Sequence, residues 1–84
     1  MNCIELKSLL VDNNEREANY SIYPNTTFMY DSVAHIQKLS DGTWRTFYFE
    51  KGDLDYLTIH ATESEACIRF LKEFYPELLS QIEE

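Results

Sequence analysis

The sequence predicts an α+β domain in which an antiparallel meander sheet of three to four strands packs with a short N-terminal helix and with C-terminal helices. An aromatic, strand-like run at residues 43–50 leads through the turn residues Lys51-Gly52-Asp53 into a second such run at residues 54–60. A capped, amphipathic helix pattern begins directly afterwards at Thr62. The length of 84 residues predicts one small domain, residues 1–84, with a modest core.

The N-terminal quarter predicts a helix followed by a short strand. Apolar side chains in residues 3–11 recur at helical spacing, at Cys3, Leu6 and Leu10. Asp12-Asn13-Asn14 predicts the end of this helix, because Asn and Asp side chains compete for backbone hydrogen bonds. Residues 12–19 are polar, so we expect them to be exposed. Residues 20–23 alternate and predict a strand, and Pro24-Asn25 predicts a turn after it.

Three further strands are expected at residues 33–39, 43–50 and 54–60. Ser40-Asp41-Gly42 and Lys51-Gly52-Asp53 separate them, and both contain the glycine that a tight turn favours. Strands joined by tight turns pair antiparallel, which predicts the meander.

The alternation of side chains sorts these strands into two faces. One face is almost entirely apolar, and we expect the helices to cover it: Ala34, Ile36, Phe47, Phe49, Leu57 and Ile59. The other face mixes aromatic and polar side chains: His35, Gln37, Trp44, Thr46, Tyr48, Glu50, Tyr56, Thr58 and His60.

The C-terminal third predicts two helices. Thr62 is the expected N-cap, and Glu65 three residues later completes a capping box. An apolar stripe of core residues follows at helical spacing: Ala66, Cys67, Phe70, Leu71 and Phe74. Pro76 ends that helix and suits the first turn of another, whose apolar residues are Leu78, Leu79 and Ile82.

Composition excludes several classes of protein. Apolar residues make up 44% of the chain and aromatic residues 14%, which is enough to form a core and excludes a disordered chain. No apolar run is long enough to span a membrane. The N-terminal residues lack the pattern of a signal peptide, so we expect a cytoplasmic protein. Cys3 and Cys67 are then expected to be reduced, partly buried thiols.

The net charge of −8 disfavours direct binding of nucleic acid, whose phosphates repel an acidic surface. The charge is concentrated in residues 50–84, which hold nine acidic and three basic residues. Such a surface attracts basic partners, although an acidic charge also serves simple solubility.

No motif of known chemistry is present. The Cys and His residues Cys3, His35, His60 and Cys67 are isolated in sequence, without the paired spacing of a zinc site. We therefore expect no catalytic residue, no metal and no cofactor, and a protein that is not an enzyme. His35 and His60 fall on the same predicted sheet face, where a general base would still need an orienting partner.

The best candidate for a binding site lies on the mixed face of the sheet. Tyr and Trp offer large contact areas at low entropic cost, and flanking carboxylates steer a cationic partner. The predicted partner-binding residues are Trp44, Tyr48, Glu50, Asp53, Asp55 and Tyr56. The alternative is that the first helix, or residues 20–31, covers this face. A binding role requires Tyr48 and Tyr56 to be at least partly exposed.

The run Gly42-Thr43-Trp44, the strand end Phe49-Glu50-Lys51-Gly52 and the segment TIHATESEACIRFL at residues 58–71 resemble the C-terminal half of small bacterial immunity proteins. Those proteins accompany polymorphic and contact-dependent growth inhibition toxins. The resemblance covers about residues 33–74. It implies a non-enzymatic cytoplasmic protein that binds and neutralises a cognate toxin, and toxins of this kind are often basic nucleases.

Two other functions stay open at this stage. One is a small acidic interaction or regulatory domain without a toxin partner, for example a homodimer that pairs through an edge strand. The other is a nucleic-acid mimic that inhibits a nuclease. The sequence does not decide between a monomer and a homodimer.

Overall fold

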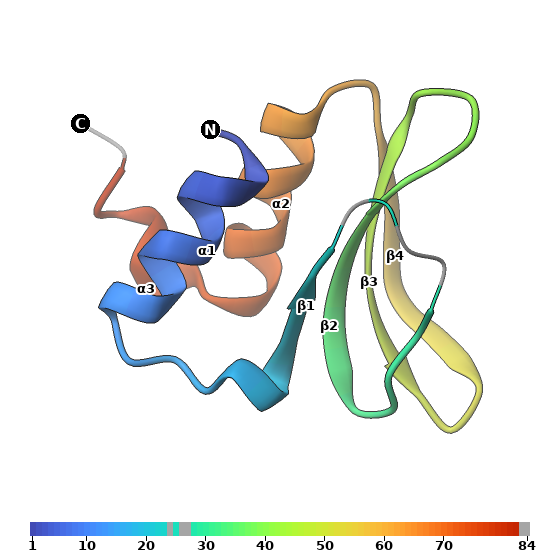
Figure 1. Ribbon diagram of the computed structural model, residues 1–84, viewed down its shortest axis with the longest axis horizontal. Coiled ribbons are helices and arrows are strands. Elements are labelled where there is room, and N and C mark those ends of the chain that lie inside the picture. Colours follow the sequence, from blue (N-terminus) through green and yellow to red (C-terminus); the bar gives the residue numbers. More distant parts are fainter. Residues whose placement is uncertain (24, 26–27, 83–84) are drawn as a thin grey trace.

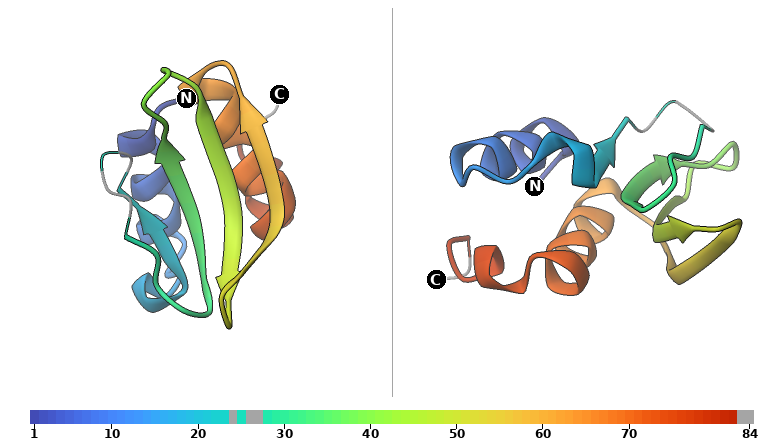
Figure 2. Two further views of the ribbon diagram at one scale, coloured as in Figure 1. Left: turned by 90° about the vertical axis from the view of Figure 1, so that its right-hand side faces the viewer. Right: turned by 90° about the horizontal axis from the view of Figure 1, so that it is seen from below.

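The computed structural model describes residues 1–23, 25 and 28–82, and it confirms the α+β prediction. Helices form one layer and a four-stranded sheet forms the other (Figure 1). The elements in chain order are α1 (Cys3–Asp12), the 3-10 helix η1 (Glu17–Asn19), β1 (Tyr20–Ile22), β2 (Val33–Lys38), β3 (Trp44–Glu50), β4 (Asp53–His60), α2 (Glu63–Phe74) and α3 (Pro76–Leu79). The view along the layers shows α1, α2 and α3 on one side of the sheet (Figure 2).

The sheet has the order β1-β2-β3-β4. The predicted antiparallel meander is confirmed for β2, β3 and β4. It is wrong for β1, which pairs parallel with β2, Tyr20 lying opposite Ala34 and Ile22 opposite Ile36. The reason is the long connection from Ile22 to Val33. It allows β2 to begin at the same end of the sheet as β1, whereas a tight turn would have made the two strands antiparallel. The turn predicted at Pro24-Asn25 falls partly outside the described residues.

Both predicted hairpin turns are present. Between β2 and β3, the Leu39 amide donates to the Thr43 carbonyl and closes a three-residue loop with Gly42 at φ +90°. Between β3 and β4, Lys51 and Gly52 have φ of +50° and +83°, the signature of a two-residue turn in which both central residues are left-handed.

The predicted assignment of residues to sheet faces is wrong for β2. Ile36 pairs with Thr46, and Ala34 with Tyr48, so these β2 residues lie on the same face as Trp44. The prediction placed Ile36 on the face of Phe47, and a register that differs by one residue moves every side chain of β2 to the opposite face.

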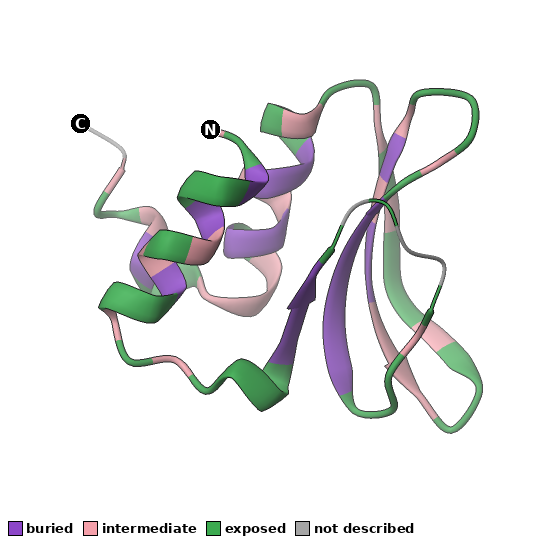
Figure 3. Ribbon diagram, viewed as in Figure 1, coloured by how far each residue is buried: buried purple, intermediate pink, exposed green. Residues whose placement is uncertain are grey.

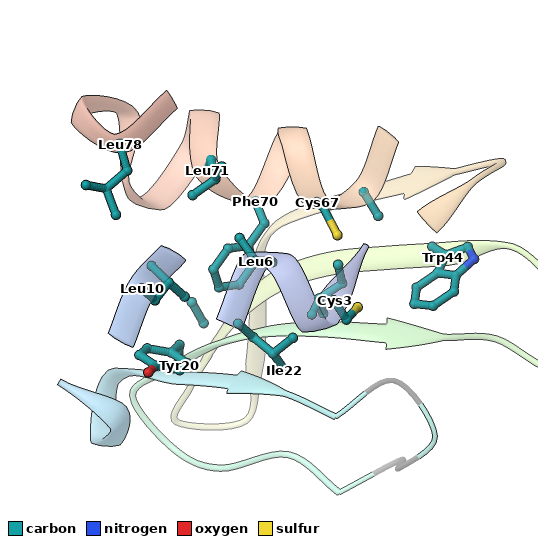
Figure 4. Close-up of a cluster of buried hydrophobic side chains, with 13 residues drawn as sticks. Cys3, Leu6, Leu10, Tyr20, Ile22, Trp44, Cys67, Phe70, Leu71 and Leu78 are labelled. Atoms are coloured by element: carbon teal, nitrogen blue, oxygen red, sulfur yellow. The ribbon is translucent and has the colours of Figure 1, made fainter. Parts of the chain in front are cut away.

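The prediction of which face is covered is also wrong. The helices pack on the face of Trp44, Thr46 and Tyr48, and the Trp44 side chain retains only 8% of its exposure. Figure 3 shows the buried interior concentrated between the helices, β1 and β2, with β4 largely exposed. Figure 4 shows α1 contributing Leu6 and Leu10, and α2 contributing Phe70 and Leu71, to one cluster with Trp44.

The helix boundaries follow from their caps. Asn2 and Glu5 form a reciprocal capping box at α1, with bonds of 2.9 and 3.0 Å, which the sequence analysis did not predict. At α2, the Thr62 hydroxyl accepts from the Glu65 amide at 3.2 Å, but among the described residues no return bond from Glu65 completes the expected box. Pro76 begins α3 as predicted, and Ile82 lies beyond its end but still packs on the core.

A β-bulge interrupts the pairing of β3 with β4. Thr46 faces Thr58, whereas Tyr48 faces Asp55, so β4 holds one extra residue between these pairs. Tyr56 occupies this bulge with φ +58°, a region that side chains other than glycine and asparagine rarely adopt.

The bulge predicts an unusual order of stability for two variants. Tyr56→Gly and Tyr56→Ala both remove the ring, so they differ only in backbone preference. At a left-handed position, glycine should be more stable than alanine by about 1 kcal/mol. Urea unfolding of both variants measures this difference. In a regular strand alanine would be the more stable, and that order would contradict the bulge.

Candidate functional site

Four of the six predicted binding residues lie together at the end of the β3–β4 hairpin. Glu50 pairs with Asp53 across the turn, and Asp55 lies opposite Tyr48. Asp53, Asp55 and Tyr56 are exposed, and Glu50 is half-buried. We call Glu50, Asp53, Asp55 and Tyr56 the hairpin site.

The structure separates the other two predicted residues from this site. Trp44 lies at the opposite end of β3, pairs with His60 and is buried beneath the helices, so it is not part of the hairpin site. Tyr48 is half-buried and packs against the core. The requirement that Tyr48 and Tyr56 be at least partly exposed is met. Helices cover most of this face, but α2 is the helix that contacts β2, β3 and β4, whereas the alternative named the first helix or residues 20–31.

The carboxylates of the hairpin site form no ion pair with any described residue. The ion pair present in the described part of the chain is Arg69 with Glu73 on α2, at 3.5 Å. Lys51 in the turn is the basic residue next to the hairpin site in sequence. The negative potential of this end of the sheet is therefore available to a positively charged partner.

Tyr56 is positioned by the bulge. Its left-handed backbone places the ring against the edge of the Phe74 ring, with centroids 6.3 Å apart and an interplanar angle of 85°. The side chain still keeps 64% of its exposure. A large ring that is held by one contact and remains open to solvent is suited to anchor a protein interface.

Sequence reasoning missed an exposed apolar strip beside the hairpin site. Leu57 and Ile59 were expected beneath the helices, but they lie on the opposite face of β4 and are 45% and 55% exposed. The half-buried Leu54 and Phe49 continue this face toward the turn, and these two pair with each other. The sequence of β4 did not indicate which face would be open to solvent, because apolar residues occur on both of its faces.

Residues 28–31 cover another part of the helix-free face, and a hydrogen bond to His35 holds them there. The Tyr30 amide donates to His35 Nε2 at 2.9 Å, and Nδ1 donates to the Val33 carbonyl at 2.8 Å. The ring stacks on Phe47, with centroids 4.8 Å apart, and is fully buried. The Gln37 side chain also donates to the Phe28 carbonyl at 3.1 Å. His35 is thus a neutral residue with both nitrogens bonded, and it holds this segment on the sheet.

The prediction that the two histidines share a sheet face is wrong, because they lie on opposite faces. His60 is on the helix side, where its Nε2 bonds to the Thr58 hydroxyl at 2.8 Å, and that hydroxyl bonds to Thr46 at 2.7 Å. Burial lowers the pKa of both histidines. Each histidine forms hydrogen bonds within the fold, and neither points toward the hairpin site.

Among the described residues, no group of three His, Cys, Asp or Glu side chains lies close enough to hold a metal ion. Cys3 and Cys67 are buried and form no disulfide, and the hydrogen bond of the Cys3 thiol with Cys67, together with burial, raises the pKa of Cys3. None of the described helices combines the length and apolar character needed to cross a membrane.

Comparison of the chain with protein-family models, with curated proteins and with solved structures found no match.

The state of His35 predicts a loss of stability in mild acid. Because the folded pKa lies below the ordinary value of 6.5, the unfolded chain binds more protons as the pH falls. The free energy of unfolding should therefore be constant above about pH 7.5 and decrease as the pH falls below 6.5. His60 contributes with the same sign.

Urea unfolding between pH 7.5 and 5 measures this slope. His35→Asn should flatten it more than His60→Asn, because His35 is the more buried. A slope that neither substitution changes would contradict the assignment.

Proposed function

We propose that this protein is a cytoplasmic immunity protein, not an enzyme, that binds a cognate bacterial toxin and blocks its active site. The observation that carries the proposal is the hairpin site, where three carboxylates that pair with no described basic residue flank the exposed ring of Tyr56. The resemblance of residues 33–74 to immunity proteins supports it. The net charge of −8 fits a basic partner, such as a nuclease domain.

The mechanism would be occlusion by charge mimicry. A nuclease binds its substrate through cationic side chains that contact phosphates. In the complex, the carboxylates of Glu50, Asp53 and Asp55 would occupy positions where those phosphates lie in the substrate. Long-range attraction would raise the association rate, and Tyr56 would supply buried contact area.

Co-expression tests the proposal. The C-terminal domain of the toxin-like reading frame next to this one is expressed in a bacterium with and without this chain, and the two proteins are then co-purified. Growth rescue together with a stoichiometric complex is the expected result. Death of both cultures without a complex would reject the immunity function and favour an acidic interaction domain with another partner.

The electrostatic part of the proposal predicts the effect of a double charge reversal. Asp53→Lys with Asp55→Lys should lower the association rate with the toxin domain by about tenfold and reduce its dependence on salt. Stopped-flow or surface-binding kinetics across a salt series measures both quantities.

The matched control reverses two exposed acids elsewhere, Asp12→Lys with Glu77→Lys, which changes the net charge equally. If the control slows association as much as the hairpin variant does, the effect comes from net charge alone, and the hairpin site is not the contact.

A further inference from the structure

β4 is an outer strand of the sheet with an open edge. It pairs with β3 on one side, and the sheet order places no described strand on its other side. Figure 2 shows β4 along the border of the sheet, with α2 behind it on the helix side. Unpaired strand edges present backbone donors and acceptors that another strand can use.

The hydrogen-bond pattern shows which backbone groups face outward. The carbonyls of Thr43 and Phe49 accept bonds from Leu39 and Ser32, on the β2 side of β3. Because these directions alternate along a strand, Trp44 and Thr46 direct their groups toward β4. Their partners are His60 and Thr58, so the intervening Ile59 directs its N–H and C=O away from β3. Its side chain is 55% exposed as well.

The bulge at Tyr56 divides this edge into two parts of different chemistry. The part before it, residues 53–55, carries the carboxylates of Asp53 and Asp55. The part after it, residues 57–60, pairs regularly with β3 from Thr58 onward and exposes the apolar side chains of Leu57 and Ile59. Charged residues and bulges protect edges against unspecific pairing, so one short segment is left for strand addition.

We propose that residues 57–60 accept an extended segment of the partner protein as an added fifth strand. The added segment would place apolar side chains beside Leu57 and Ile59, and lysine or arginine side chains beside Asp55 and Asp53. Backbone bonds would supply affinity, and the carboxylates would set the register. The inference rests on the proposed function in taking the partner to be a basic protein.

Charge argues against a second copy of this chain as the added strand. If two copies paired antiparallel through residues 57–60, the chain leaving one copy would run past Asp55 and Asp53 of the other. The residues that follow β4 include the acidic Glu63 and Glu65 in the first turn of α2. Like charges would then meet, and the helix would end the pairing.

The test uses synthetic peptides and the intact protein. The probe is an eight-residue peptide of alternating lysine and valine, and its control is one of alternating glutamate and valine. Backbone NMR is expected to show that the lysine peptide shifts the amide signals of residues 57–60 and slows hydrogen exchange at Ile59. The glutamate peptide should bind at least tenfold more weakly.

Ile59→Pro tests the outward backbone group. Proline is tolerated on an edge strand where the N–H faces solvent, so β4 should remain paired with β3 while peptide binding falls at least tenfold. Ile59→Val is the control that keeps the N–H. If the proline variant does not fold, Leu57→Lys with Ile59→Lys replaces it, and it should weaken binding of the lysine peptide by a similar factor.

The inference would be overturned by the absence of shifts in residues 57–60, by equal binding of both peptides, or by binding that is unchanged in the variants. A dimer that dissociates in Ile59→Pro would overturn it in favour of a second copy.

The toxin complex separates the two proposals. Full rescue and affinity with Ile59→Pro would reject strand addition and leave the immunity function standing. Pairing of the lysine peptide with β4 in a protein that rescues no toxin would support strand addition and reject immunity.

Discussion

The register of the β2–β3 hairpin is the constraint on which the rest of the structure depends. Closing the loop between Leu39 and Thr43 sets Ile36 opposite Thr46 and Ala34 opposite Tyr48. This pairing places Ala34 and Ile36 on the same face as Trp44. Leu6 and Phe70 of the helix layer pack against that face. It also moves His35 to the other face, where it holds residues 28–31 against the sheet.

The bulge in β4 is the second determinant, and it connects the fold to the candidate function. It keeps Thr58 and His60 on the helix side, where buried hydroxyls satisfy one another through hydrogen bonds. It also turns Tyr56 toward Phe74 and leaves the regular end of β4 open. A strained backbone at an exposed aromatic residue beside carboxylates fits the binding role proposed for this hairpin. The acidic and the apolar parts of the edge would then serve one partner, by steering and by strand pairing.

Local signals in the sequence were sufficient for the α-helices and strands, but not for the 3-10 helix η1 or for the packing of the elements. Gly42 and Gly52 marked the turns, Thr62 marked the start of α2, and Pro76 marked the start of α3, because each acts through its own backbone. The covered face could not be predicted in this way, since both faces of β3 carry large apolar side chains and the loop register decides between them. Tyr56 in a left-handed conformation has no local signal, because its residue type disfavours that region. The acidic hairpin of the candidate site was predicted from composition and turn position. The burial of Trp44 and the exposure of Leu57 and Ile59 were not predicted.

The register itself can be measured directly by cross-strand contacts between α-protons. In an antiparallel pair, residues that are opposite but not hydrogen-bonded to each other bring their Cα atoms to about 4.5 Å, and their α-protons give strong nuclear Overhauser effects. The structure predicts these signals between Ile36 and Thr46 and between Ala34 and Tyr48. Signals that link Ile36 with Phe47 and Ala34 with Phe49 would contradict the account, because they would return Phe47 and Phe49 to the face of Ile36 and place a different surface beneath the helices.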